Sequence, residues 1–116
     1  MEYRLTEAAA QDVDDILRET GRQFGRLQRK RYAELIERAI QMVADDPERP
    51  GYRQRDDLAN GVRSFHVELA ARRWGAASHV LYYLRGRLGD GCEGVIIARV
   101  LHDRMEPLRH MTRGLP

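Results

Sequence analysis

The chain has 116 residues, of which 42% are hydrophobic and 33% charged, and its formal net charge is +2 with histidine neutral. This length and composition predict one soluble globular domain, and they exclude a disordered, fibrous or multidomain chain. No apolar run approaches the ~18 residues of a membrane helix, no signal peptide is evident, and the lone Cys92 excludes an internal disulfide, so we expect a cytoplasmic protein without a metal or other cofactor.

The first half of the chain predicts a short strand and a helical hairpin. Residues 3–5 form the strand candidate, and Thr6 is suited to cap the helix that follows. The apolar residues of this helix predict one buried stripe, formed by Val13, Ile16, Leu17, Thr20 (through its methyl) and Phe24. Gly25 marks the turn into a second helix that ends near Pro47. Its predicted buried stripe consists of Leu27, Tyr32, Leu35, Ile36, Ala39, Ile40 and Val43.

The second half changes to the alternating pattern of strands. A polar loop at residues 47–60 precedes predicted strands at 62–67, 79–85 and 95–101, and residues 107–111 predict one helical turn. The last two strands are joined by a glycine-rich loop. The predicted fold class is α+β, with an N-terminal short strand and an α-helical hairpin packed on an antiparallel sheet of three to four strands, all in a single domain of residues 1–116.

Alternation along the strand at 79–85 separates two sets of side chains. We expect Val80, Tyr82 and Leu84 to face the helices. His79, Tyr83 and Arg85 would then lie on an open face of the sheet, with Arg63 and Arg99 as neighbours.

Three basic clusters are candidate binding sites. The strand at 95–101 ends in Arg99, His102 and Arg104, which need either internal carboxylates or an anionic partner. The run from Arg26 to Arg31 begins a helix, where positive charge opposes the macrodipole, so it either contacts an acidic partner or phosphate or is a solvated face. At residues 72–74, two arginines and the only tryptophan form a binding hot spot or a base-stacking platform, unless Trp74 covers the sheet.

The charge of the chain is uneven. Residues 1–59 hold 11 Lys/Arg against 13 Asp/Glu, a net charge of −2, whereas residues 60–116 hold 9 against 5, a net charge of +4, and carry all four histidines. Two partners of different character would explain this asymmetry, and so would an unevenly charged solvated surface.

The open face also permits a catalytic interpretation. RNA cleavage by in-line attack of the 2′-hydroxyl needs a base, an acid and cations, and His79, Tyr83 and the neighbouring arginines supply those types. The exposed polar face of a one-sided sheet has the same appearance. A glycine-rich phosphate loop of the Gly-Lys-Ser/Thr kind is absent from the sequence.

Three blocks of the sequence carry recognisable motifs. The first is Tyr3-Arg4-Leu5-Thr6 followed by the Asp-rich residues 12–16, and the second joins residues 61–65 with residues 78–85. The most specific block is Ile97-Ala98-Arg99-Val100-Leu101-His102-Asp103-Arg104-Met105-Glu106-Pro107. Together the blocks resemble the ParE/RelE superfamily of toxins, and above all its ParE branch. The last block is similar to the family signature I-x-R-[VI]-L-H-x-R-M-D.

The resemblance implies the toxin of a type II toxin–antitoxin module, held inactive by a cognate, ParD-like antitoxin that docks along the helices and sheet. ParE-type members are associated with DNA gyrase poisoning, growth regulation, plasmid maintenance and stress response, and RelE-type members with mRNA cleavage in the ribosome. The predicted strands contain no lysine and no tyrosine follows Arg104, so gyrase inhibition is preferred to RNA cleavage. An inactive member that keeps only its antitoxin is a third hypothesis. We expect neither a membrane partner nor sequence-specific DNA binding by the toxin alone.

The resemblance and the patterns together name three sets of candidate residues. The target-binding set is Arg72, Arg73, Trp74, Arg99, His102, Arg104 and Met105. The antitoxin-binding set is Leu17, Phe24, Tyr32, Ile36, Tyr83 and Arg85. If the chain is a ribonuclease, its catalytic set is Arg63, His79, Arg99, Arg104 and His110.

Overall fold

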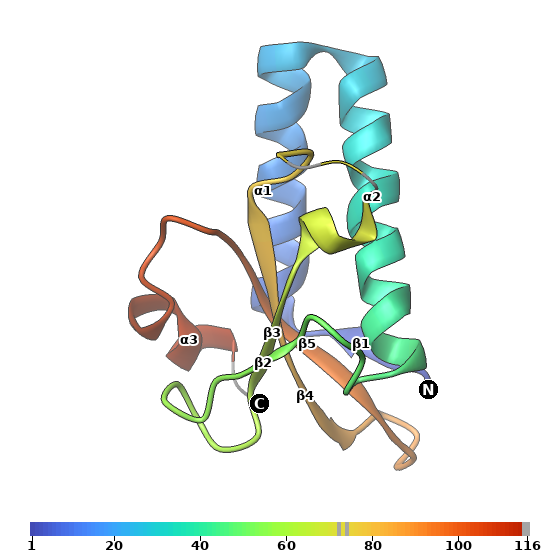
Figure 1. Cartoon of the computed structure of the whole chain (residues 1–116), viewed down its shortest axis with the longest axis vertical. Coiled ribbons are helices and arrows are strands. Elements are labelled where there is room, and N and C mark those ends of the chain that lie inside the picture. Colours follow the sequence, from blue (N-terminus) through green and yellow to red (C-terminus); the bar gives the residue numbers. More distant parts are fainter. Residues whose placement is uncertain (72, 74, 115–116) are drawn as a thin grey trace.

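The computed structural model describes residues 1–71, 73 and 75–114 of the chain. A helical hairpin stands on a mixed sheet, and a short helix covers the other face, which confirms the α+β class (Figure 1). The elements in chain order are β1 (Tyr3–Leu5), α1 (Glu7–Phe24), α2 (Arg26–Asp45), β2 (Arg53–Gln54), β3 (Arg63–His66), a 3₁₀ turn (Val67–Ala70), β4 (His79–Arg87), β5 (Glu93–His102) and α3 (Leu108–Gly114). None of the helices in the described residues is long and apolar enough to cross a membrane.

The sheet has five strands in the order β1-β5-β4-β3-β2, one more than the predicted maximum. β1 pairs in parallel with β5, and the other neighbours are antiparallel. β2 was missed because its two residues are exposed on an edge and lie within a polar loop, where no alternation marks a strand.

The hairpin begins and turns where the sequence predicts. The hydroxyl of Thr6 accepts a hydrogen bond from the Ala9 N–H at 3.0 Å and donates one to the Ala98 carbonyl of β5 at 2.8 Å, so the helix cap is also tied to the sheet. Gly25 separates the helices with φ +90°, a conformation that side chains with a Cβ rarely adopt. The far end of the hairpin extends beyond the strands (Figure 1).

This overhang overturns part of both predicted buried stripes. Phe24 is 68% exposed and Leu27 is 61% exposed, because the sheet does not reach the turn of the hairpin. Deeper along α2 the stripe is buried as predicted, for example at Ile36 and Val43. The hairpin thus has a buried base and a solvent-exposed tip.

The sheet is buried on both faces, so the predicted open face is wrong. The core beneath the hairpin includes Leu81 and Tyr83 of β4, whereas Tyr82 belongs to a second core on the opposite face. Val80 and Leu84 pack against that second core, so the predicted orientation of β4 is reversed. The error arises because α3 supplies apolar cover to the second face, and alternation cannot tell which of two apolar faces meets the hairpin.

β5 contains a bulge that changes the direction of its side chains. Tyr82 of β4 pairs with Arg99, but the next residue, Tyr83, pairs with Ile97, which leaves Ala98 as an extra residue. Ala98 and Leu101 both belong to the second core although they are three residues apart. Arg99 lies at this irregularity.

A candidate functional site between the helical hairpin and the sheet

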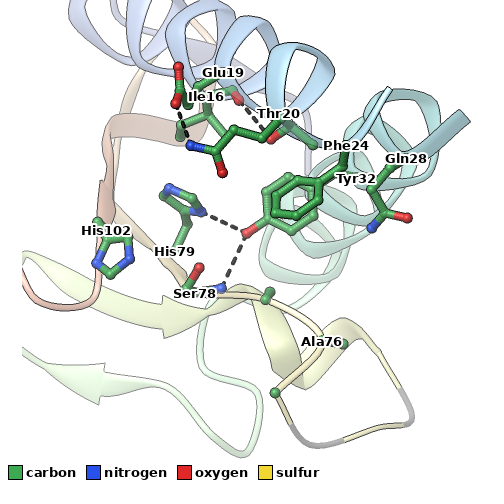
Figure 2. A pocket seen from close by; sticks show the side chains of 13 residues that line it. Ile16, Glu19, Thr20, Phe24, Gln28, Tyr32, Ala76, Ser78, His79 and His102 are labelled. Carbon is green, nitrogen blue, oxygen red and sulfur yellow. Dashed lines mark hydrogen bonds between the residues drawn. The ribbon is translucent and has the colours of Figure 1, made fainter. Parts of the chain in front are cut away.

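A cleft of about 470 Å³ opens between the two long helices and the start of β4 (Figure 2). Ile16 and Phe24 of α1, with Ala76 and Ala77 ahead of β4, give it apolar walls. The remaining lining residues are Glu19, Thr20, Gln23, Gln28, Tyr32, Gly75, Ser78, His79 and His102. The cleft therefore joins apolar walls to a polar end formed by tyrosine and histidine.

A tyrosine–histidine pair forms that polar end. The Ser78 N–H donates to the Tyr32 hydroxyl oxygen at 3.3 Å, and the hydroxyl lies 2.6 Å from Nδ1 of His79 (Figure 2). Because the hydroxyl accepts from Ser78, its own proton is free to be donated to Nδ1 of His79. The imidazole proton of His79 is then on Nε2.

His79 is held in its neutral form. Burial is the main cause that lowers the pKa of His79 from 6.5 to about 4, and the neighbouring His102 lowers it further, while Asp103 acts in the opposite direction. The rings of His79 and His102 meet edge to face with centroids 5.4 Å apart. At neutral pH, His79 therefore acts as a hydrogen-bonding group and not as a cation.

His66 and His102 both lie beside the Asp103 carboxylate at the strand ends, with ring nitrogens 3.0 Å and 3.3 Å from its oxygens. Nδ1 of His66 accepts from the Glu68 N–H, so Nε2 carries the proton and donates to the Asp103 carboxylate at 3.0 Å. This hydrogen bond is the main cause that lowers the pKa of Asp103. The Asp103 N–H donates to the Ser78 carbonyl at 2.8 Å. Asp103 thus joins the ends of β3 and β5 to the segment ahead of β4.

Arg99 is buried, so its predicted place at an exposed cationic edge is wrong. Its side chain is 6% exposed, and Nε and Nη2 each donate to the Asp12 carboxylate at 2.7 Å. Nη1 donates to the His110 carbonyl of α3 at 2.6 Å, and Asp12 also accepts from the Val100 N–H. The carboxylate that Arg99 needs is therefore internal, and the ion pair fastens β5 to α1 and α3.

The other members of the target-binding set have different surroundings. His102 is partly exposed, and its Nδ1 accepts from the Arg104 N–H at 3.1 Å. Arg104 and Met105 are exposed just beyond it, and Arg73 is exposed near the cleft. Arg72 and Trp74 lie outside the described residues.

Two members of the antitoxin-binding set are not at the surface. Ile36 and Tyr83 are 2% and 0% exposed, and the Tyr83 hydroxyl donates to the Pro47 carbonyl, so the structure contradicts them as surface contacts. Leu17 is partly buried against the core, and Arg85 lies 3.5 Å from Glu93. Phe24 and Tyr32 line the cleft.

The proposed ribonuclease residues share a site only in part. His79, Arg99 and His110 line a small hollow of about 190 Å³ beside α1, but Arg63 and Arg104 do not line it. Arg63 pairs with Glu48 at 3.2 Å, whereas Arg99 is enclosed by Asp12 and α3. Arg63 aligns with Tyr83, four residues along β4 from His79, which corresponds to roughly 13 Å. Among the described residues, no group of three or more His, Cys, Asp or Glu side chains is arranged to hold a metal ion.

Sequence reasoning missed Asp12, His66 and Asp103 as members of the site. Asp12 lies in the Asp-rich start of the first helix, and its ion-pair partner is 87 residues away, so no local pattern marks the pair. The one available signal was that Asp12 and Asp103 both occur in the blocks that resemble the toxin family.

Comparison with known proteins places the sequence in a family. Residues 3–107 match the family described as the ParE toxin of the type II toxin–antitoxin system parDE. Toxin ParE1 of Caulobacter vibrioides is 33% identical over 109 residues, which cover 94% of this chain and 96% of that protein. The match includes both helices of the hairpin, every strand and the segment after β5. The chain therefore belongs to the ParE family of type II toxin–antitoxin toxins.

Proposed function

We propose that this toxin stops bacterial growth by poisoning DNA gyrase in the cytoplasm, and that a cognate, ParD-like antitoxin neutralises it. Family membership supports the toxin and its antitoxin, since the matched family is defined by a paired system. We choose gyrase as the target for two reasons. The end of the chain resembles the ParE branch, and the segment after β5 presents exposed side chains on a fixed turn.

The observation that carries the proposal is the segment after β5. The hydrogen bond from His66 to Asp103, and that from the Arg104 N–H to His102, hold this segment at its start. Arg104 and Met105 then extend outward, and Met105 is 47% exposed. An exposed cation beside an exposed apolar side chain on a fixed turn suits the recognition of a protein partner.

A ribosome-dependent ribonuclease is the second candidate. The histidines and arginines in the chain favour it by residue type, and His79, Arg99 and His110 line one small hollow. The internal partners of these groups weigh against it. Arg99 is occupied by Asp12, and Nδ1 of His79 by Tyr32. Arg63, Arg104 and His110 would then have to cleave RNA without a free Arg99 guanidinium and without a free Nδ1 on His79.

The test is a gyrase supercoiling assay with purified toxin, with and without its antitoxin, run beside a primer-extension assay for mRNA cleavage. We expect inhibition of supercoiling that the antitoxin relieves, and intact mRNA. Arg104→Ala should weaken inhibition about tenfold with an unchanged thermal melt, since exposed hot-spot truncations cost 1–2 kcal/mol or more. Arg53→Ala, an exposed arginine on β2, is the matched control.

Three outcomes would count against the proposal. Cleaved mRNA with normal supercoiling would favour the ribonuclease. Normal growth during expression would favour an inactive member that keeps only its antitoxin. A loss of cooperative unfolding in Arg104→Ala would mean that this residue supports the fold instead of the target contact.

A further inference from the structure

The tip of the hairpin, residues 20–31, is strongly basic. It contains five cations and no acidic residue, in a chain whose net charge is only +2. Arg22 pairs with Glu19 of α1. The other four cations are exposed and form no ion pair among the described residues; they are Arg26, Arg29, Lys30 and Arg31. The partial positive charge at the N-terminal end of α2 adds to their field, so the tip concentrates positive charge.

Two exposed apolar side chains stand among these cations. Phe24 and Leu27 lie on either side of the turn residue Gly25, and the tip that carries them extends beyond the strands (Figure 1). Lys30 and Arg31 follow Leu27 by three and four residues, so they lie beside it on the surface of α2. The apolar side chains are therefore bordered by positive charge.

The tip is a well-packed turn. The Gly25 N–H donates to the Gly21 carbonyl at 2.9 Å, and the Gly25 carbonyl accepts from the Arg29 N–H at 3.1 Å, so both helices continue up to this one residue. A Cβ at Gly21 would lie only 3.1 Å from Cδ of Arg29, which places the aliphatic part of Arg29 against the opposite helix. The cations and the apolar side chains are thus presented by a fixed backbone.

We infer that the tip of the hairpin binds duplex DNA without regard to sequence. The cations of α2 would contact backbone phosphates, and Phe24 and Leu27 would pack against bases at a kinked or interrupted step. Proteins that kink DNA combine the same two elements, which are cations on the phosphates and an apolar wedge between base pairs. DNA binding by the tip does not depend on the target of the toxin. Its part in poisoning rests on the proposed function, because gyrase would hold the duplex that the tip contacts.

Duplex DNA suits this surface better than a polypeptide does. Four cations without one acid call for a partner of uniformly negative charge, and a phosphate backbone supplies one charge per ~1.7 Å of helix axis. The centre of a protein interface is usually depleted of lysine and of charge in general, whereas here cations border the exposed apolar side chains. The faces of bases are apolar and lie within a rim of phosphates, which is the complementary arrangement.

The first test measures binding of the full-length toxin to a short fluorescent DNA duplex over a range of salt concentrations. Arg26→Glu/Lys30→Glu, which leaves the packing of Arg29 on Gly21 intact, should weaken binding about tenfold at low salt, because two phosphate contacts become repulsive. The slope of log affinity against log salt should fall by about 2, since each phosphate contact contributes about 0.9. Arg53→Glu/Arg87→Glu, the same charge change on exposed arginines of β2 and β4, should stay within about threefold.

The second test uses the same duplex with a single-nucleotide gap. The wild type should bind the gapped duplex about tenfold more tightly than the intact one, because an interrupted step costs less to unstack. Phe24→Ser/Leu27→Ser should lose this preference and keep the salt dependence. Leu69→Ser, which changes an exposed leucine of the 3₁₀ turn, should keep both.

The opposite results would overturn the inference. If the wild type binds no DNA, or if Arg26→Glu/Lys30→Glu binds it as well as the control does, the tip is not a DNA site. Inhibition of gyrase by such a toxin would leave the proposed function standing. DNA binding without gyrase inhibition would instead support the tip and contradict the proposed function.

Two further controls separate DNA from other partners. If Arg26→Glu/Lys30→Glu keeps its DNA affinity but loses affinity for the purified antitoxin, the tip is a protein contact and the inference fails. Tighter binding of an RNA duplex of the same sequence would overturn the choice of DNA. Cooperative thermal melts of every variant would exclude unfolding as the cause of a lost affinity.

Discussion

Two groups of arginines in this toxin have opposite environments. Arg99 is buried, and its Nε, Nη1 and Nη2 each donate to Asp12 or to the His110 carbonyl. The arginines at the start of α2 are exposed and have no ion-pair partner in the described residues. Both groups look like cationic sites in the sequence. The difference between them lies in whether the fold brings a carboxylate within reach.

The largest effect should come from breaking the buried pair. Asp12→Ala leaves the Arg99 guanidinium buried without its counter-ion and removes the acceptor of the Val100 N–H, so the free energy of unfolding should fall by about 3–5 kcal/mol. Urea unfolding of the variant and the wild type would measure this fall in the free energy of unfolding. Asp15→Ala, in the same helix, removes an exposed ion pair with Arg18 and an exposed hydrogen bond from Gln11, and it should change stability by less than about 1 kcal/mol. Equal effects of the two variants would mean that burial does not distinguish the two ion pairs.

The same contrast applies to apolar residues of the hairpin. Ile36→Ala removes a side chain that is 2% exposed and should cost about 2–5 kcal/mol. Leu27→Ala, at the exposed tip, should change stability by about 0.5 kcal/mol or less. Thermal and urea unfolding of the pair would test this, and a large loss in Leu27→Ala would show that the tip is buried in solution, for example by self-association.

The elements that could be predicted from sequence are those with strong local signals. Thr6 and Gly25 mark the ends of α1, and the helical spacing from Tyr32 to Val43 fixes the buried side of α2. The orientation of β4 could not be predicted, because both of its faces are apolar and the cover from α3 is a tertiary feature. The bulge at Ala98 leaves no pattern in the sequence either.

The candidate site was predictable only in its residue types. Tyr32 and His79 were both singled out, but for different roles, and their contact joins residues 47 apart in the chain. Arg99 is the clearest example. The sequence predicted that it belongs to an exposed cationic cluster, but in the structure it forms a buried ion pair with Asp12. Spacing along a strand can indicate which side chains share one face of a sheet. Which partner a side chain meets depends on packing between elements that are distant in the sequence.

The free energy of unfolding should depend on pH through His79. Its pKa is lowered to about 4, so the unfolded chain binds more protons than the folded chain between about pH 6.5 and pH 4. Stability contributed by neutral His79 is therefore present above pH 6.5 and is lost as the pH falls toward 4, by up to about 3 kcal/mol. The titratable groups around it are Tyr32, whose hydroxyl contacts Nδ1, and the more distant charges of His66, His102, Asp103 and Asp12. Urea unfolding at pH 7 and pH 4.5 should show a smaller difference for His79→Gln than for the wild type, and equal differences would mean that other groups cause the loss.

The smallest effect should appear at the exposed arginines, with the opposite sign. Arg26→Glu replaces a cation by an anion in the first turn of α2, where the helix dipole favours negative charge. Because Arg26 is exposed and forms no ion pair in the described residues, the change should stabilise the fold by about 0.3–1 kcal/mol at low salt and less at high salt. Arg53→Glu, on a strand edge, should have no comparable effect. A stabler Arg26→Glu variant would show that the cation in this turn is not needed for the fold. A destabilised variant would mean instead that Arg26 has a structural partner, and the contrast with Arg99 would then be one of degree.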